Sequence, residues 1–319
     1  LAEYGIVDLD DIAISHAKLL EMPLRRRRRE AYGFDSVFID EAHCFNPNEL
    51  SVLQMLLRES ADRRAIVVAV DIPQGIGSKG YEGDGLEKSL FQASQSLIAA
   101  GDSYYLDTSH RCSREVLELA NSIYAQGARF FAPVRTPSIL KSARISDEQT
   151  VKRPTYSVYA DTVTMLNAIL ANAEMLSAQC KCRHSDILIV FFQEQHFEQL
   201  PPQLLAASVI LQSDSDMQNT RIAQRNNSYV LARPEFLHGL EYEAVLLVGI
   251  TAGEVPKMSL TRGHRGAAAI YATQRSVDLL YLALTRARQT VSILAEKKIS
   301  ALFELAITQS CIQPIKPTE

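Results

Sequence analysis

The chain has 319 residues, of which 47% are hydrophobic and 22% are charged, and its formal net charge is −4. This length predicts about two domains, and no apolar run reaches the roughly 20 residues that a membrane-spanning helix needs. The acidic balance excludes a general attraction to nucleic acid, so any such contact must come from local basic clusters. Five cysteines in no framework spacing indicate a reducing compartment, and we therefore expect a cytoplasmic location.

The first segments are a helix and a basic run. Residues 8–20 carry apolar side chains at helical spacing, and Asp8 is a suitable N-cap. Residues 25–29 are five consecutive arginines. We expect a solvent-exposed loop there, and the alternative is a contact with a phosphate backbone.

Two adjacent carboxylates follow an apolar run. Residues 37–39 are apolar without alternation, which predicts a strand buried on both faces of a parallel sheet. Asp40 and Glu41 come next, at the carboxyl end of that strand, where α/β sheets carry their chemistry. One carboxylate can hold Mg²⁺ while its neighbour activates a water, as in the Walker B arrangement. The alternative is a strand that ends in a solvated acidic turn.

A second strand is expected soon after. Residues 48–59 read as an amphipathic helix and residues 65–70 as another buried strand. The amide of Gln74, just past this strand, can both donate and accept, so it can bridge a γ-phosphate and a neighbouring domain. Residues 75–85 predict a flexible glycine-rich loop and residues 86–100 a helix. The phosphate-binding pattern G-x-x-x-x-G-K-[ST] does not occur in the sequence.

An arginine then precedes a helix. Residues 104–106 predict a short strand, and Ser113 is expected to cap a helix that runs to about Tyr124. Arg111 lies just before this helix, a position that suits anion binding through its donors and the helix dipole. Residues 130–154 are expected to be irregular.

The remaining sequence alternates strands and helices. We expect strands at residues 155–160, 186–192, 244–250 and 291–294, helices at 162–178 and 274–288, and a polar loop at 213–228. The apolar run at 186–192 predicts a strand that is buried on both faces. Cys180, Cys182 and His184 lie close together, but no second ligand pair at zinc spacing accompanies them, so no metal site is predicted there.

The last predicted helix ends in arginines. Val277, Leu280, Tyr281 and Leu284 should face inward, and Arg286 and Arg288 follow. Arginines at a helix C-terminus commonly complement the dipole. A role as a finger on a phosphate requires a second domain opposite.

Six of these stretches resemble, in order, the motifs of the UvrD/Rep-type superfamily 1 DNA helicases. DLDD resembles the segment before motif II, VFIDEAH motif II, VDIPQ motif III, LDTSHR motif IV, HGLEYEAVLLVG motif V and YLALTRAR motif VI. The resemblance implies an α/β fold with the P-loop NTPase helicase core of two RecA-like parallel-sheet domains. Residues 1–103 would form part of the first domain, which is incomplete, and residues 104–319 the second.

The resemblance also assigns roles. ATP and Mg²⁺ would be the cofactors, and the partner would be single-stranded DNA or a duplex with a single-stranded tail, tracked with 3′→5′ polarity, with a nuclease or repair protein as a further partner. The implied site is Asp40 on Mg²⁺, Glu41 on the attacking water, Gln74 on the γ-phosphate, Arg111 and Arg286 as fingers, and His110 and Glu241 in the nucleotide-binding set.

The sequence departs from the family at several positions. The Walker A loop is absent, and we expect it upstream of Leu1 in a longer chain, so that this fragment alone is inactive. His110 stands at the family's motif IV tyrosine, and His238 replaces its motif V lysine. These changes favour an alternative, a non-hydrolysing nucleic-acid-binding or scaffold module that partners a nuclease. A metal-dependent nuclease using Asp40 and Glu41 is a third reading.

Overall fold

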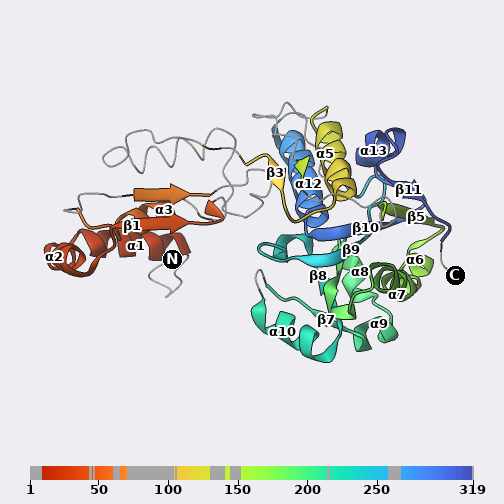
Figure 1. The fold of residues 1–319 in the computed structure, drawn as a ribbon, viewed down its shortest axis with the longest axis horizontal. Coiled ribbons are helices and arrows are strands. Elements are labelled where there is room, and N and C mark those ends of the chain that lie inside the picture. The colour runs from red at the N-terminus through yellow and green to blue at the C-terminus, as the bar shows by residue number, and fades with distance from the viewer. Residues whose placement is uncertain are drawn as a thin grey trace. The chain divides into compact units, whose positions relative to one another are not determined.

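The computed structural model describes residues 9–42, 45, 47–59, 65–69, 104, 106–129, 141–143, 152–213, 216–257 and 267–317. The chain divides into two compact units, Leu1–Tyr104 and Tyr105–Glu319 (Figure 1). In the described ranges, no helix is both long and apolar enough to cross a membrane.

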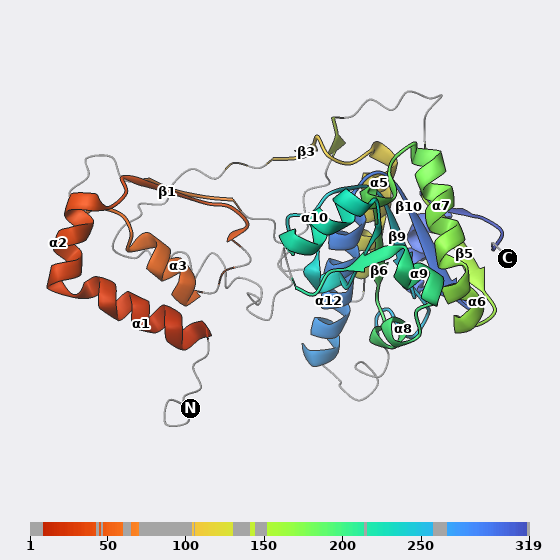
Figure 2. The same ribbon diagram turned by 90° about the horizontal axis from the view of Figure 1, so that it is seen from below.

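The first unit combines helices with a parallel pair of strands. Its elements are α1 (Leu9–Glu21), α2 (Pro23–Tyr32), β1 (Ser36–Ile39), α3 (Pro47–Gln54) and β2 (Ala65–Val68). The strands β1 and β2 are parallel, as their sequences predict, and Val37 lies opposite Ile66. In Figure 2, α1 and α3 lie on one side of β1. Ile39 and Leu50 are buried between strand and helix, and form the small core of this unit.

The prediction that both strands are buried on both faces is wrong. Burial alternates along β1 and β2, and Phe38 is 76% exposed. The reason is that α3 covers one face, with α1 packed against α3, while in the described part of the unit no element covers the other face.

The predicted loop at the arginine run is also wrong, because these residues form α2. Arginine is a good helix former, and Pro23 at the start has the backbone angle that a first helical turn needs. The helix ends at Gly33, where a Cβ would lie 2.4 Å from the carbonyl oxygen of Arg29. Only a residue without a side chain allows this close return of the chain.

The second unit is built on a seven-stranded, wholly parallel sheet in the order β11-β5-β10-β9-β6-β8-β7. This confirms the predicted α/β fold, and it is the sheet type that a RecA-like domain has. Its strands are β5 (Thr155–Tyr159), β6 (Ile187–Phe191), β7 (Ser208–Ile210), β8 (Tyr229–Ala232), β9 (Tyr242–Val248), β10 (Ala287–Glu296) and β11 (Gln313–Pro314).

Helices cover both faces of this sheet. Figure 1 shows α5 (Arg114–Gly127) and α12 (Ala267–Leu284) on one side and α7 (Ile169–Cys180) and α9 (Pro202–Ala206) on the other. All five residues of β6 are therefore buried, as predicted. The remaining elements are α6 (Thr162–Asn167), η5 (His184–Asp186), α8 (Glu194–Glu198), α10 (Met217–Asn226), η6 (Pro234–Phe236), η7 (Ala301–Phe303), α13 (Glu304–Thr308) and the two-residue pair β3 (Thr108–Ser109) and β4 (Lys141–Ser142).

Several predicted boundaries need correction. The strand expected at residues 104–106 lies instead at β3, where it pairs with β4. The loop expected at 213–228 contains the helix α10, whose start is capped by Asp216 accepting from the amide of Asn219 at 3.1 Å. The helix expected at 162–178 is divided at Ala168 into α6 and α7.

The end of α12 lies earlier than predicted. The helix stops at Leu284, so Arg286 lies in the connection to β10 and Arg288 in β10 itself. Val277, Leu280, Tyr281 and Leu284 are buried, as predicted. The predicted loop at 75–85 and helix at 86–100 lie outside the described residues.

Candidate functional site

The two adjacent carboxylates lie directly after β1. Asp40 is exposed, and its Oδ1 accepts a hydrogen bond of 2.9 Å from the backbone amide of Glu41. Glu41 has φ of 51°, in the left-handed region that costs a residue with a side chain about 1–2 kcal/mol. Ala42 then re-enters the unit, with its amide donating to the Ala69 carbonyl at 2.9 Å. A tight turn therefore presents both carboxylates at the carboxyl end of β1, where a hard divalent cation could be held.

Gln74 lies outside the described residues. Its predicted contact with a γ-phosphate stays a prediction.

In the second unit, Arg111 and Glu241 form an ion pair. The Nε of Arg111 lies 2.6 Å from Oε1 of Glu241, and each side chain is 35% exposed. Arg111 is in the turn between β3 and α5, and Ser109 Oγ accepts from its backbone amide at 3.3 Å. Two stretches far apart in the sequence, those resembling motifs IV and V, thus meet through their charged side chains.

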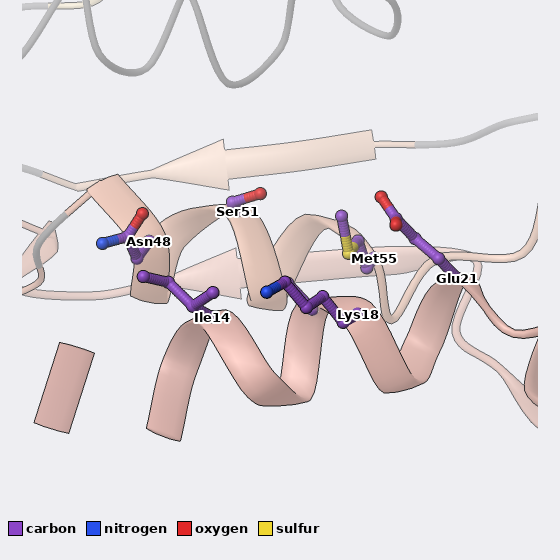
Figure 3. A pocket seen from close by; sticks show the side chains of 7 residues that line it. Ile14, Lys18, Glu21, Asn48, Ser51 and Met55 are labelled. Atoms are coloured by element: carbon purple, nitrogen blue, oxygen red, sulfur yellow. The ribbon is translucent and has the colours of Figure 1, made fainter. Parts of the chain in front are cut away.

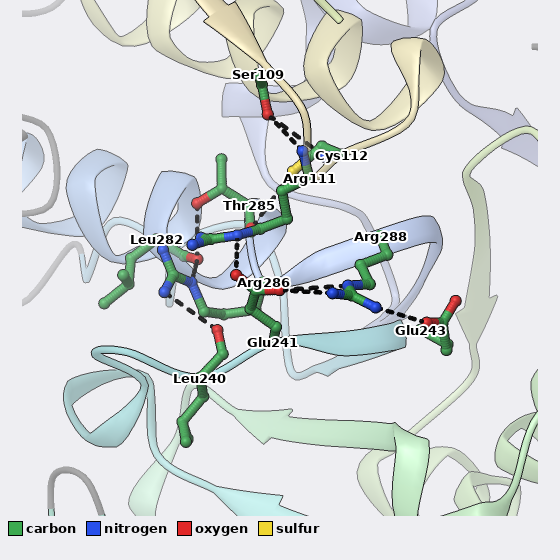
Figure 4. A network of polar contacts seen from close by, with 10 residues as sticks. All are labelled: Ser109, Arg111, Cys112, Leu240, Glu241, Glu243, Leu282, Thr285, Arg286 and Arg288. Carbon is green, nitrogen blue, oxygen red and sulfur yellow. Dashed lines mark hydrogen bonds and ion pairs between the residues drawn. The ribbon is translucent and has the colours of Figure 1, made fainter. Parts of the chain in front are cut away.

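Arg288 shares the same carboxylate (Figure 4). Its Nη2 donates to Oε2 of Glu241 at 3.1 Å, and its Nη1 donates to Oε1 of Glu243 at 3.3 Å. The hydrogen bond to Glu243 is the main cause that raises the pKa of Arg288 above its ordinary value. Gln289 donates to Oε2 of Glu243 at 2.5 Å and accepts from Lys152.

Backbone hydrogen bonds hold the parts of this network together. The amide of Ser113, at the start of α5, donates to the carbonyl of Arg288 at 2.8 Å, and the Ser113 hydroxyl donates to the carbonyl of Gln289 at 2.9 Å. The amide of Tyr242, at the start of β9, donates to the carbonyl of Arg286 at 2.9 Å. The cluster therefore lies at the amino ends of β9 and β10, beside the N-terminus of α5.

This arrangement suits an anion. Two partly exposed guanidinium groups stand next to the positive end of a helix, and planar donor forks match phosphate oxygens. Glu241 and Glu243 balance the two positive charges, so an incoming phosphate would have to displace the carboxylate of Glu241 from at least one arginine. Glu241 and Glu243 lie two residues apart in the sequence, so in an extended strand their side chains point to the same side.

Arg286 is placed differently from Arg111. Its residue surface is only 1% exposed, its Nε donates to the carbonyl of Leu282 at 3.2 Å, and its Nη1 donates to the carbonyl of Leu240 at 3.2 Å. The chain turns inward after α12, where the Thr285 hydroxyl donates to the Tyr281 carbonyl at 2.9 Å. Arg286 thus caps the C-terminus of α12, the common structural use of such an arginine. A finger role for Arg286 stays a prediction, and this structure does not expose its guanidinium to a ligand.

His110 and Arg288 complete the comparison with the predicted site. His110 is exposed in the turn that carries Arg111. Arg288 was not among the predicted site residues, because it was expected to end a helix and not to begin a strand. Because Arg288 lies near the start of β10, its side chain reaches Glu241 and Glu243 at the start of the neighbouring strand β9.

The cysteine cluster has the character of packed neutral thiols. Burial raises the pKa of Cys180, and burial is also the largest cause that raises the pKa of Cys182 to about 12. The ring of His184 stacks on Tyr229 at 4.5 Å between centroids. Across the ranges that the structure covers, no three His, Cys, Asp or Glu side chains are grouped to hold a metal ion.

In the part of the chain that the structure describes, two of the pockets lie away from the predicted site residues. One of about 340 Å³ lies between α1 and α3 of the first unit and mixes apolar and charged groups (Figure 3): Ile14, Ala17, Lys18, Glu21, Asn48, Ser51 and Met55. Another of about 260 Å³ lies in the second unit and is lined by residues that include Gln193, Thr251 and Glu296. Neither contains a predicted site residue.

No protein-family model and no curated protein sequence matches the chain. Among solved structures it is similar to the C-terminal domain of a possible DNA helicase from Lactobacillus plantarum WCFS1. The identity is 12% and the TM-score 0.42, over 65% of this chain and 98% of that one. A similarity of this size carries no argument about activity, and the α/β fold rests on the parallel sheet itself.

Proposed function

We propose that the chain is part of an ATP-dependent DNA helicase or translocase of the UvrD/Rep type. The observation that carries the proposal is the ion pair between Arg111 and Glu241, at 2.6 Å. The sequence resemblance assigns both residues to the nucleotide, and such an assignment requires that they lie together. The order of the six motif-like stretches supports the same function.

The residues fit ATP and Mg²⁺ in chemical type. Asp40 offers an exposed carboxylate for a divalent cation, while Arg111 offers a partly exposed guanidinium beside a helix N-terminus for phosphate oxygens. When bound, Mg²⁺ neutralises charge on the β- and γ-phosphates. In this proposal Glu41 orients the attacking water, Gln74 senses the γ-phosphate, and Glu241 contacts either the ribose or the network on the metal side.

The direct test is ATP hydrolysis with and without single-stranded DNA. It should be measured on this chain and on a longer chain that carries a G-x-x-x-x-G-K-[ST] loop, since nothing in the 319 residues supplies that loop. We expect hydrolysis stimulated by DNA in the longer chain and none in the shorter one. Absence of hydrolysis in a folded longer chain that binds ATP would contradict the proposal.

One observation favours the non-hydrolysing alternative. Arg286, the second of the two implied fingers, is buried and bonded to backbone carbonyls. A module that binds nucleic acid or a partner nuclease without turnover has no need of an exposed second finger. Nucleotide binding without hydrolysis in the longer chain is the result that this alternative predicts.

A further inference from the structure

The helix α2 carries more positive charge than its surroundings neutralise. Its ten residues include five consecutive arginines, and its first turn contains no acidic residue. Positive side chains near a helix N-terminus oppose the helix dipole, and neighbouring like charges repel each other. The sequence therefore keeps these charges at some cost to the helix, which indicates a use outside the fold.

Two of the five arginines have a structural role. Arg26 Nε donates to Oε2 of Glu59 at 2.9 Å, and Arg29 Nη2 donates to Oε1 of the same carboxylate at 2.5 Å. Arg29 also donates to the carbonyl of Met55 at 2.9 Å. These bonds fix which side of α2 faces the rest of the first unit.

The other three arginines are left on the outside of the helix. Arg25, Arg27 and Arg28 are exposed, and among the residues that the structure describes none of them has an acidic partner. Arg25 and Arg28, with Tyr32, follow the spacing i, i+3, i+7, which places them along one stripe of a helix. Tyr32, at the end of the stripe, is 86% exposed.

We propose that this stripe binds a nucleic acid strand, with phosphates on Arg25 and Arg28 and a base stacked on Tyr32, while Arg27 on another side of the helix adds to the local positive charge. Arginine forks match phosphate oxygens, and an exposed aromatic ring is the platform on which single-stranded bases stack. From Arg25 to Tyr32 the helix rises about 10 Å, close to the length of three nucleotides in a stacked strand. An acidic peptide would use the charges but not the ring, so the ring favours a nucleic acid.

This inference adds to the proposed function a surface that binds the nucleic acid strand. It rests on α2 alone, and it holds equally for a chain that hydrolyses no ATP. The carboxylates and arginines of the nucleotide site take no part in it, so a failure of either proposal leaves the other standing.

The test uses the full chain and a labelled single strand of 20 thymidines, with binding followed by fluorescence anisotropy at several salt concentrations. A variant with Arg25→Ala, Arg27→Ala and Arg28→Ala is compared with a control that loses the same charge from exposed arginines of the second unit: Arg153→Ala, Arg221→Ala and Arg225→Ala. We expect the first variant to bind about tenfold or more weakly. The slope of log K against log salt should fall by about 1.4, because each of the two phosphate contacts contributes about 0.7.

Variants of Tyr32 distinguish base stacking from general electrostatic attraction. Tyr32→Ala should weaken binding about fivefold or more with the salt slope unchanged, and Tyr32→Phe should restore it, because the ring and not the hydroxyl stacks. Both effects should persist in the presence of polyglutamate of matched length.

Three results would overturn the proposal. They are equal losses in the two triple variants, no loss in Tyr32→Ala, or competition by polyglutamate as strong as by unlabelled strand. Circular dichroism should show that the variants fold, since Arg26, Arg29 and Glu59 are unchanged in all of them. If the triple variant does not fold, the single change Arg28→Glu is compared with Arg225→Glu in the same assay.

Discussion

Arg286 and Arg288, two residues apart, illustrate how differently one charged group can be used. Arg286 is buried at the end of α12, whereas Arg288 is 42% exposed in its side chain and pairs with Glu241 and Glu243. Exposed ion pairs contribute little to stability, while a buried guanidinium satisfies carbonyl groups that otherwise lose their partners. Arg286 and Arg288 therefore allow a matched comparison between a buried and an exposed arginine.

We predict that Arg286→Ala lowers the free energy of unfolding by about 2–4 kcal/mol, because it leaves a cavity and removes hydrogen bonds from two carbonyls. Arg288→Ala should lower it by about 1 kcal/mol or less. Urea unfolding followed by circular dichroism measures both. Equal, small effects would mean that Arg286 is exposed in solution, as a phosphate-binding finger has to be.

Glu41 gives a prediction about the chemical step. In a longer chain that carries the Walker A loop, Glu41→Gln should abolish ATP turnover, because an amide cannot take a proton from the attacking water. ATP binding should be retained, since the proposal assigns the metal to Asp40. Steady-state hydrolysis and equilibrium nucleotide binding are the two measurements. Retained turnover in Glu41→Gln would remove this residue from the reaction.

His196 gives a prediction about pH. It is 1% exposed, neither ring nitrogen has a hydrogen-bond partner among the described residues, and burial lowers its pKa below the ordinary value of 6.5. At a pH below 6.5 the unfolded chain takes up a proton that the folded chain does not, so stability falls as the pH falls through this region. Unfolding midpoints at pH 7.5 and at pH 5.5 test this.

The control for His196 is a variant without the titrating ring. His196→Leu should show a weaker loss of stability than the parent between these two pH values. An identical pH dependence in His196→Leu and the parent would contradict the assignment.

At the scale of elements, the N-terminus of α5 connects the strand β10 to the candidate site. Ser113 Oγ accepts from the amide of Val116 at 3.3 Å and donates to the carbonyl of Gln289 at 2.9 Å, so one side chain caps the helix and ties it to β10. The sequence predicts the cap, because serine before an apolar helix is a common start signal. It does not predict the tie to β10, which depends on residues far along the chain.

We predict that Ser113→Ala destabilises the chain by about 1–2 kcal/mol, through loss of the cap and of the bond to β10. Ser113→Thr should retain most of the stability, since its hydroxyl can make both bonds. Thermal unfolding compares the three chains. A parent-like Ser113→Ala variant would show that neither bond matters in solution.

The strands show what the sequence can and cannot predict. The apolar runs at β1 and β6 look alike, and both were predicted to be buried on both faces. Only β6 is, because helices cover both faces of its sheet, whereas α3 covers a single face of β1. A run of apolar letters predicts a strand, but the burial of its second face depends on elements placed elsewhere in the chain.

The candidate site, too, could be predicted from the sequence only in part. The motif-like stretches pointed to Arg111 and Glu241, and the structure brings these two residues into contact. The motif-like stretches did not point to Arg288, because the predicted boundary between α12 and β10 lies four residues later in the chain than the observed one. Element boundaries are the feature that is hardest to predict from sequence. These stretches also gave no sign that Arg286 is buried, which depends on the carbonyl of Leu240 from a different segment.

At the scale of the whole molecule, the proposed function draws on both units. The carboxylates Asp40 and Glu41 belong to the first unit, and the Arg111–Glu241–Arg288 network belongs to the second. The net charge of −4 makes the arginines of α2 an exception in an acidic chain. A nucleic acid strand would be drawn to that local cluster and not to the molecule as a whole.

The central claim is that Arg111 acts on a bound phosphate, and its most direct test is a pair of alanine variants three residues apart. Arg114 is 71% exposed in its side chain and pairs with Glu118 on the surface of α5, so Arg114→Ala removes the same group from outside the site. In the longer chain we predict that Arg111→Ala slows DNA-stimulated ATP hydrolysis by about 10³-fold or more, while Arg114→Ala hydrolyses ATP at the rate of the parent. Equal rates in the two variants would contradict the account.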